Sequence, residues 1–391
     1  MDINFHYYAV KVLAESAEFD GNSAQIIAEY SQFVDDHDPI CKIFIKEENV
    51  PPFARYLCDH GVTPFLNEDI RSEDILKKSL MRDDIPSELY GEIYNNLFLE
   101  ENANEKDAEY VLDESYWSIG WNRFTPVVTG FSGLKYALLI LTSWQENTVI
   151  PFHFIPKISI KDLTGQKYRV NPYNHGDSNN ILLDNLISQS ICKNPKKEDL
   201  IRVGIIAHIF ADTYSHQMFS GYNADENNCS LLSRKYNVEK YFPEDRLETD
   251  ELLPSIGHMW VSTAPDESNV SFKIQFKSPA KVYERNNTIE FLTAAIRLLN
   301  YLREVKHLPP LTREDSQWVS LEAKLRKGFL INNPDGWRKE FPTIKFDYNK
   351  ERIFPYNKGY TDWYTFPENY FWFNVIADDI RNKVIGNKPT R

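Results

Sequence analysis

The sequence predicts a mainly α-helical protein with a small β element. Residues 180–193, 197–220 and 286–305 place apolar side chains at helical spacing. Within 267–283, apolar and polar residues alternate, which predicts a short pair of strands. The polar segment 226–254 is expected to be rich in loops. We therefore expect helices to form the core and a small sheet to be added to it.

The chain before these helices is expected to alternate between short helices and connections. Residues 2–18 and 22–33 predict two short helices. Residues 47–113 are acidic and interrupted by prolines, and we interpret them as an insertion or lid-like segment with helical patches. A helix-like segment at 132–145 precedes the apolar stretch 149–156, which its prolines are expected to keep extended.

The chain is expected to have two parts, an all-α core at residues 1–305 and an aromatic-rich extension at residues 306–391. The run from Trp363 to Phe373 is too apolar to remain solvated, and disordered tails are poor in aromatic residues. We therefore expect residues 306–391 to form a cap packed on the core. Because amphipathic aromatic side chains also favour lipid interfaces, peripheral membrane contact is the alternative role of this extension.

Composition and charge restrict the class of protein. The chain has 391 residues, of which 42% are hydrophobic and 26% charged, as is typical of folded proteins. A formal net charge of -13 argues against a protein that coats duplex nucleic acid, because that task needs a basic surface. Four scattered cysteines without a C-x-x-C pair predict neither a disulfide framework nor a thiolate zinc site, and fit a reducing compartment.

The sequence contains no recognisable targeting or membrane-spanning segment. No basic residue precedes Lys11, and the start has no long apolar run, so it does not resemble a secretory signal. Other apolar runs, such as residues 136–141, are far shorter than the roughly 20 residues of a membrane helix. We expect a soluble cytoplasmic protein, although a signal-independent export route stays open.

The sharpest chemical signal is the segment His208-Ile-Phe-Ala-Asp212-Thr-Tyr-Ser-His216. Side chains four residues apart lie one turn above each other on the same helix face, so His208, Asp212 and His216 form a ladder that can ligate metal ions. The alternative is a pair of core histidines hydrogen-bonded to the central aspartate. Burial of all three side chains without a cation would carry a large desolvation cost, which favours a metal.

Two further candidate pairs lie near the start of the chain. Asp2 and His6 are four residues apart, although acids are also common in the first turn of a helix. Asp35 and Asp36 lie just past residue 33, at the C-terminal end of the second expected helix, where acids oppose the helix macrodipole. Unfavourable local charge of this kind suggests a bound cation.

The last candidates lie farther along the chain. His153 stands in an apolar stretch, where a lone histidine is more often a core residue than a ligand. His258 follows Gly257, which allows close backbone approach, and Asp266 comes one short segment later. Each is ordinary when taken alone, and their order along the chain carries the next inference.

Four motifs carry a family resemblance: D-x-x-F-H-Y-Y-A, S-Q-F-V-D-D, P-F-H-F-I-P and H-x3-D-T-x-S-H-Q. In this order they resemble the zinc-dependent phospholipase C and single-strand nuclease superfamily. They are more similar still to an uncharacterised bacterial branch of it. The resemblance spans residues 2 to 266 and leaves the C-terminal third without a counterpart.

The resemblance implies a multi-helix phospholipase C/nuclease-like core that uses two to three zinc ions to hydrolyse a phosphodiester. Nitrogen and carboxylate ligands suit zinc and leave manganese or iron as alternatives. The implied ligands are Asp35, His153, His208 and Asp212 for one ion, His6 and Asp212 for a second, and His216, His258 and Asp266 for a third. Asp35 or Asp36 would also orient the nucleophilic water as general base. The expected substrate is a phospholipid or single-stranded nucleic acid.

The sequence departs from the superfamily pattern at three places. The superfamily ligates zinc through the amine and carbonyl groups of an N-terminal Trp, for which Asp2 would have to substitute here. His216 lies four residues beyond Asp212, where the superfamily has six. Asp266 lies eight residues beyond His258, where the superfamily has four.

Two other interpretations remain open. His6 and the doublet His37-Asp38 have the order found in HD-type phosphohydrolases, although Pro39 follows the doublet at once. Alternatively, the metals would staple a non-catalytic binding protein whose aromatic C-terminal region recognises a partner. Closed four-ligand sites without an open position would favour this second alternative.

Overall fold

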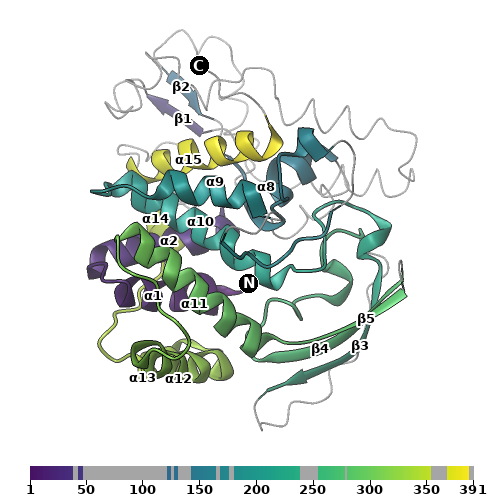
Figure 1. Ribbon diagram of the computed structural model, residues 1–391. Coiled ribbons are helices and arrows are strands. Elements are labelled where there is room, and N and C mark those ends of the chain that lie inside the picture. Colours follow the sequence, from purple (N-terminus) through teal and green to yellow (C-terminus); the bar gives the residue numbers. More distant parts are fainter. Residues whose placement is uncertain are drawn as a thin grey trace, which may run out of the picture.

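The computed structural model describes residues 1–37, 43–46, 121–124, 127–130, 142–163, 168–175, 180–237, 254–277, 280–353 and 368–386. Within these ranges the protein is mainly helical and carries a small three-stranded sheet (Figure 1). The helical segments are η1 (Asn4–Ala9), α1 (Val10–Ser16), α2 (Gly21–Asp36), α7 (Thr142–Trp144), η5 (Gln145–Val149), α8 (Ile150–His153), η6 (Ile160–Leu163), α9 (Ile181–Ser190), α10 (Lys197–Ser215), η8 (Asp225–Asn227), η9 (Met259–Val261), α11 (Asn287–Val305), α12 (Ser316–Ile331), α13 (Pro334–Glu340), α14 (Lys350–Ile353) and α15 (Glu368–Ile385). The strands are β1 (Ile43–Lys46), β2 (Trp121–Phe124), β3 (Cys229–Tyr236), β4 (Val270–Lys277) and β5 (Ala280–Asn286).

Helix α10 is the buried centre of the fold. From Leu200 to Ser215, every residue except Arg202 is buried. A helix that is enclosed around its whole circumference must be covered on all sides. Helices α2, α8, α9, α11 and α15 provide this cover. The side chains of α10 are therefore held in fixed positions inside the molecule.

Helices α2 and α10 run side by side in the same direction. A Cβ atom on Gly204 would lie 2.6 Å from the carbonyl oxygen of Ile27, so glycine permits the close approach. One turn later, His208 Nδ1 donates a hydrogen bond to the carbonyl oxygen of Ser31 over 2.9 Å. One further turn brings Asp35 of α2 to the level of the His-x3-Asp ladder on α10.

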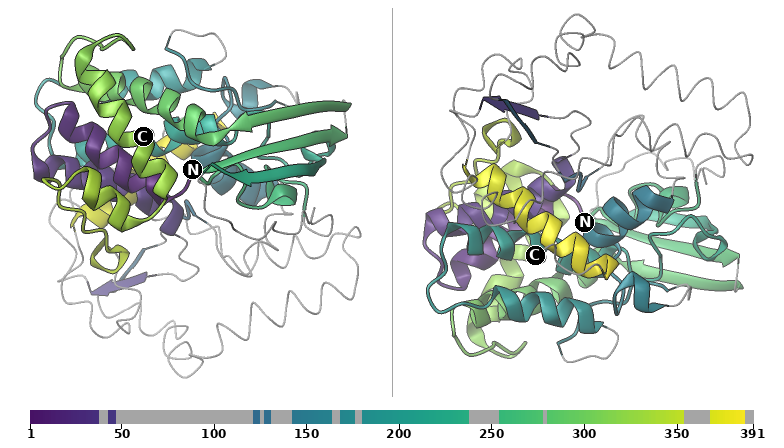
Figure 2. Two further views of the ribbon diagram at one scale, coloured as in Figure 1. Left: turned by 90° about the horizontal axis from the view of Figure 1, so that it is seen from below. Right: turned by 90° about the horizontal axis from the view of Figure 1, so that it is seen from above.

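The three-stranded sheet projects from one side of the helices (Figure 2). Its strands are antiparallel in the order β3-β4-β5, with Ile274 of β4 paired to Leu231 and Tyr283. The alternating side chains Val270, Phe272, Ile274 and Phe276 are buried in a second core beneath the sheet. Full burial of such side chains contributes roughly 1.5–3 kcal/mol each.

The described C-terminal helices belong to the main core. Phe329 of α12 stacks on Phe5 of η1, with ring centroids 5.8 Å apart. Trp337 of α13 donates a hydrogen bond from Nε1 to Asn4 over 2.9 Å. Helix α15 packs against α10 and buries Tyr370 and Phe373. None of the helices in the described part of the chain has the length and apolar character needed to span a bilayer.

The structure confirms the main helices and the strand pair, with shifts at their ends. The helices predicted at 180–193, 197–220 and 286–305 are α9, α10 and α11, and the pair predicted within 267–283 is β4 and β5. Three predicted segments lie wholly or mostly outside the described residues. They are the acidic insertion at 47–113, most of the helix at 132–145, and the part of the aromatic run that contains Trp363, Tyr364 and Phe366.

Two predictions from the sequence were wrong. The stretch 149–156 is helical from Ile150 to His153, because Pro151 occupies the first turn, where its missing N–H is not needed. The segment 226–254 contains strand β3, which lies at an edge of the sheet. Edge strands are half-exposed, so their residues show little of the apolar alternation by which strands are recognised.

Candidate metal centre

Five histidines and three aspartates meet where the helical core joins the second core under the sheet. His6 comes from η1, Asp35 from α2, His153 from α8, His208 and Asp212 from α10, and His216, His258 and Asp266 from the segments that follow α10. They form three groups whose ligand atoms lie within 4.8 Å of one another: His6, His208 and Asp212; Asp35, His153 and His208; and His216, His258 and Asp266. The structure thus brings together eight of the predicted ligands.

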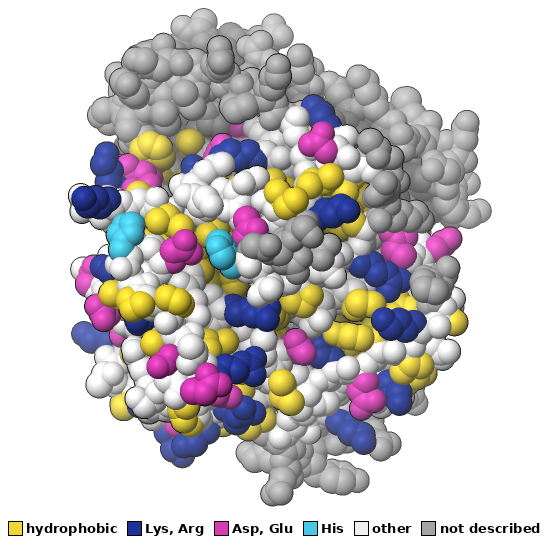
Figure 3. Space-filling view, in the orientation of Figure 1, with side chains coloured by type: hydrophobic (Ala, Val, Ile, Leu, Met, Phe, Trp, Pro, Cys, Tyr) yellow, Lys and Arg dark blue, Asp and Glu magenta, His cyan; other side chains and the backbone are white. Residues whose placement is uncertain are grey.

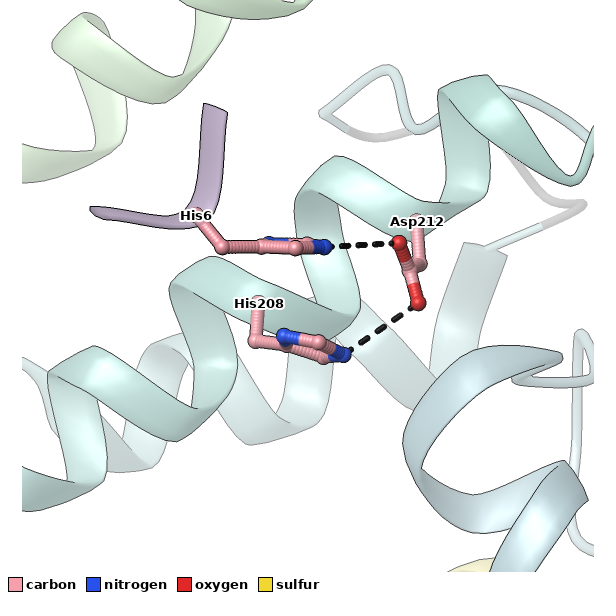
Figure 4. Close-up of side chains that lie close together, drawn as sticks. All are labelled: His6, His208 and Asp212. Carbon is pink, nitrogen blue, oxygen red and sulfur yellow. Dashed lines mark hydrogen bonds and ion pairs between the residues drawn. The ribbon is translucent and has the colours of Figure 1, made fainter. Parts of the chain in front are cut away.

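Asp212 is the shared centre of these groups. Its Oδ1 lies 3.1 Å from His6 Nε2, and its Oδ2 lies 3.0 Å from His153 Nδ1 and 3.2 Å from His208 Nε2. Figure 4 shows the rings of His6 and His208 approaching the carboxylate of Asp212 from two different elements. His216 Nδ1 lies 3.6 Å from Asp212 Oδ2, so the third group also adjoins this carboxylate.

Backbone carbonyls fix the protonation of the rings of His153 and His208. His153 Nε2 donates to the carbonyl oxygen of Thr129 over 2.8 Å, and His208 Nδ1 donates to that of Ser31 over 2.9 Å. A carbonyl oxygen only accepts, so in a neutral ring the opposite nitrogen carries a lone pair. These two lone-pair nitrogens lie 3.2 Å apart, and both lie 3.8 Å from Asp35 Oδ1. Such an arrangement of lone pairs and carboxylates is what a cation requires.

The third group repeats this arrangement. His216 Nδ1 donates to the carbonyl oxygen of His153 over 2.6 Å, and His258 Nδ1 donates to that of Ser262 over 2.8 Å. Their Nε2 atoms lie 3.3 Å and 3.1 Å from the two oxygens of Asp266. Metal-ligating histidines typically donate their other ring N–H to a backbone carbonyl in this way, which leaves the nitrogen that faces the carboxylate free to bind an ion.

Two nitrogens in the centre depart from this pattern. His6 Nδ1 is buried without a hydrogen-bond partner among the described residues, so no carbonyl fixes the protonation of this ring. The α-amino group of Met1 is buried against Asp212 and lies 3.0 Å from Ser215 Oγ and 3.4 Å from Asp266 Oδ1. Burial lowers the pKa of this amine, but the carboxylates around it outweigh burial and raise its pKa to about 10.

The electrostatics of the centre favour neutral ligands and an added positive charge. Burial lowers the pKa of His208 to about 4 and that of His6 well below its usual value, so both rings are neutral at pH 7. The pKa values of His153 and His258 are raised above the usual value. Burial by itself would lower them, but the neighbouring aspartates outweigh its effect. Burial raises the pKa of Asp35 to about 8. Without a metal, protons on these groups therefore supply the positive charge that a bound cation would bring.

The ligands of the centre differ in their exposure to solvent. His6, His208 and Asp212 are at most 1% exposed, whereas the side chain of Asp35 is 32% exposed and that of Asp266 is 21% exposed. Asp35 and Asp266 are therefore the members of the three groups that contact solvent most.

Asp2 and Asp36 do not join the three groups. The carboxylate of Asp2 accepts hydrogen bonds from the backbone N–H and the side-chain amide of Asn4, over 3.0 Å and 3.1 Å. An acid at the start of a helical segment satisfies free N–H groups in this way. Asp36 accepts a hydrogen bond from the hydroxyl of Tyr348. Of the adjacent pair Asp35 and Asp36, the structure thus places Asp35 in the centre.

His37, the histidine of the HD-type alternative, also lies elsewhere. Its Nε2 is 2.7 Å from the Tyr370 hydroxyl, and its ring packs against Phe33 and Phe373. Its partner in the doublet, Asp38, is outside the described residues.

The groups that support the ligands cannot be recognised in the sequence. The acceptors at Thr129, Ser31 and Ser262 are backbone carbonyls, which leave no side-chain signal. Gly257, by contrast, has the predicted role: its φ is +52°, and a Cβ atom there would lie 2.3 Å from the ring of Phe154. That ring stacks on His216, with centroids 4.4 Å apart.

A family model for a family of unknown function, DUF6765, matches residues 1–82 and 102–381. The chain belongs to the DUF6765 family. No curated protein and no solved structure matches it. The parts matched to DUF6765 include all eight residues of the three groups.

Proposed function

We propose that this DUF6765 protein is a metal-dependent phosphoesterase with a multinuclear zinc centre in a phospholipase C/nuclease-like helical core. The observation that carries the proposal is the shared geometry of four histidines. In each, one ring nitrogen donates to a backbone carbonyl and the other faces a carboxylate. In His208 the pKa is lowered to about 4 by burial, so the ring is neutral at pH 7 and turns a lone pair toward the Asp212 carboxylate, an opposition that a cation between them would relieve.

The donor set suits zinc. It consists of imidazole nitrogens and carboxylate oxygens, and the groups contain no cysteine thiolate. Manganese or iron would accept the same ligands. Two or three divalent ions would carry more positive charge than the three carboxylates neutralise, so the loaded centre would attract an anionic substrate. A phosphoester is such an anion.

Asp35 is the residue best placed to act on the nucleophile. Divalent ions at this centre would lower the pKa of a bound water and neutralise the non-bridging oxygens of a phosphoester. The Asp35 carboxylate is partly exposed to solvent, and it would orient that water and accept its proton as general base. Asp36 is held by Tyr348, so the proposal assigns no catalytic role to it.

The face of the molecule seen in Figure 3 supports a substrate that enters the centre more than one that coats this face. On the face seen in Figure 3, Lys and Arg side chains are interspersed with Asp and Glu side chains. A mixed surface of this kind gives weak, nonspecific attraction to duplex nucleic acid. A phospholipid head group or single-stranded nucleic acid remains the proposed substrate class.

Metal analysis and a substrate screen test the proposal. Protein purified without chelator should contain two to three zinc-class ions per chain, and it should hydrolyse one among bis-p-nitrophenyl phosphate, lysophospholipid, phosphatidylcholine and single-stranded DNA. His208→Ala should abolish hydrolysis and reduce the ion count. His37→Ala is the matched control, because it removes another fully buried histidine that lies outside the three groups.

Each alternative predicts a different result. Less than one ion per chain would refute the metal centre. Ion loss in His37→Ala but not in His208→Ala would support the HD-type alternative. The complete burial of His6, His208 and Asp212 is also what a structural staple needs. A metal-loaded protein that hydrolyses none of the four substrates would therefore favour the metal-stapled binding protein.

A further inference from the structure

Arg285 is a buried cation beside the third ligand group. It lies at the end of β5, just before α11, and is 4% exposed. Its guanidinium group packs over the ring of Phe272, 4.8 Å from the centroid. A buried arginine is costly unless its donors are satisfied, so its partners indicate its role.

One side of the guanidinium group holds the end of α10. Arg285 Nη1 donates to the carbonyl oxygens of Tyr214 and Ser215 over 2.8 Å and 2.9 Å. The last carbonyls of a helix lack partners within the helix, and a positive charge there also complements the macrodipole. His216 is the next residue, so this contact fixes the backbone from which a ligand projects.

The other side holds the segment that carries Asp266. Arg285 Nη2 donates to the carbonyl oxygen of Pro265 over 2.7 Å, and Nε donates to Asn287 Oδ1 over 2.7 Å. Asn287 in turn donates from Nδ2 to the carbonyl oxygens of Ala264 and Glu267, over 2.7 Å and 2.8 Å. Backbone carbonyls before and after Asp266 are therefore bound by this pair.

We propose that Arg285, supported by Asn287, is a positioning residue that fixes His216 and Asp266 relative to each other as ligands of one ion. The inference rests on the proposed metal centre. Only the planar guanidinium fork can reach the end of α10 and the 264–267 segment at once. A lysine at this position would keep the charge but lose the fork.

Metal binding by the apo protein tests this role. Competitive titration with Zn2+ and with Co2+, followed by the Co2+ absorption spectrum, gives the number of ions and the affinity of each. Arg285→Gln and Arg285→Lys should both lower the affinity for the ion held by His216, His258 and Asp266 about 10- to 100-fold, as expected when a group that orients metal ligands is lost. The ions at the other groups should bind as in the wild type. His258→Ala identifies which step of the titration belongs to the third group.

Arg297→Gln is the matched control. Arg297 Nη1 donates to the Tyr173 carbonyl and to the Tyr214 hydroxyl, over 3.0 Å and 2.8 Å. It thus lies near the end of α10 without a contact to Ser215 or Pro265 among the described interactions. This variant should keep the affinity of the third ion.

Several outcomes would overturn the inference. Wild-type affinity for the third ion in both Arg285 variants would contradict it. An equal loss of affinity for this ion in Arg297→Gln would also contradict it. If Arg285 acted only through its charge, it would repel the ion. Arg285→Gln would then bind the ion more tightly than the wild type, and Arg285→Lys would bind it equally well. This pattern would also contradict a positioning role. If both variants fail to fold, Asn287→Ser provides the same test. Wild-type affinity for the third ion in Asn287→Ser would then contradict the inference.

The wild-type titration separates this inference from the proposed function. Wild-type protein that takes up no ion at His216, His258 and Asp266 would overturn both the third site and the role of Arg285. A wild type that binds this ion but hydrolyses no phosphoester would refute the hydrolase and leave the role of Arg285 intact.

Discussion

A Cβ atom on Gly130 would lie 2.0 Å from the carbonyl oxygen of Asp35. The adjacent Thr129 accepts the N–H of His153 at its carbonyl and donates from its hydroxyl to the Val34 carbonyl over 2.8 Å. Gly130 N–H donates to the carbonyl of His37 over 2.9 Å. Residues 129–130 therefore join the end of α2 to a ligand on α8, and they can do so only because position 130 has no side chain.

Gly130→Ala should destabilise the protein and weaken the group formed by Asp35, His153 and His208. The added methyl group meets backbone atoms, which cannot rotate away, so we expect a loss of roughly 1–3 kcal/mol in the free energy of unfolding. Urea denaturation of the metal-free protein and a metal titration measure the two effects. Gly21→Ala, on the helix α2 that Gly130 contacts, is the control, since a Cβ atom there meets nothing within 4 Å. An equal effect of both substitutions would contradict the proposed role of Gly130.

Asp212→Asn should remove more than one ion per chain. Its carboxylate adjoins His6, His153 and His208, so loss of its charge affects two groups together. Elemental analysis and the rise in melting temperature on adding zinc measure the change, because a ligand that binds only the folded state stabilises it. Asp378→Asn removes another buried carboxylate, one that is bonded to Arg381 and Asn382 on α15. This control should keep its ions, and loss of a single ion in Asp212→Asn would argue against a shared ligand.

Metal loading of the apo protein should release a proton from Asp35 at pH 7. Burial raises the pKa of this carboxyl to about 8, so it is protonated below that pH and must ionise before it can bind a metal. The release should fall as the pH rises through about 8, where the carboxyl is already ionised, and metal affinity should rise over the same range. Calorimetry in buffers with different ionisation enthalpies counts the protons.

The neighbouring acid provides the control for this titration. Asp35→Asn should release about one proton fewer than the wild type on zinc binding at pH 7. Asp36→Asn should release the same number as the wild type, because the Asp36 carboxylate is bonded to Tyr348 and lies outside the groups. If instead Asp36→Asn released one proton fewer and Asp35→Asn released as many as the wild type, Asp36 would be the ligand.

Deletion of the chain from Thr312 onward should give insoluble protein. The described part of this region buries Trp318, Phe329, Trp337 and Tyr370 in the same core as Phe5, so its removal would expose a large apolar surface. Expression trials and limited proteolysis of the full chain check this, and the full chain should resist cleavage within 316–340. A truncated protein that is soluble, holds its ions and loses only liposome binding would instead indicate a membrane-docking element and favour a phospholipid substrate.

The local part of the centre could be predicted from the sequence because helix geometry is local. Once residues 197–220 are recognised as a helix, a spacing of four places His208, Asp212 and His216 along one face whatever surrounds them. The apolar residues between them predict burial in the same way. The helix α11 and the strand pair β4 and β5 follow from periodicity by the same argument.

The sequence determined which side chains are competent to bind metal and the order in which they occur, and the tertiary structure decided which of them meet. Asp35 and Asp36 are equivalent in sequence, and only the direction of α2 beside α10 turns the first toward the centre and the second toward Tyr348. The carbonyls that orient the histidines, and the contacts by which Arg285 joins two ligand segments, arise between parts of the chain far apart in sequence. Backbone atoms are the same at every residue, so no pattern of side chains can reveal where such contacts will form.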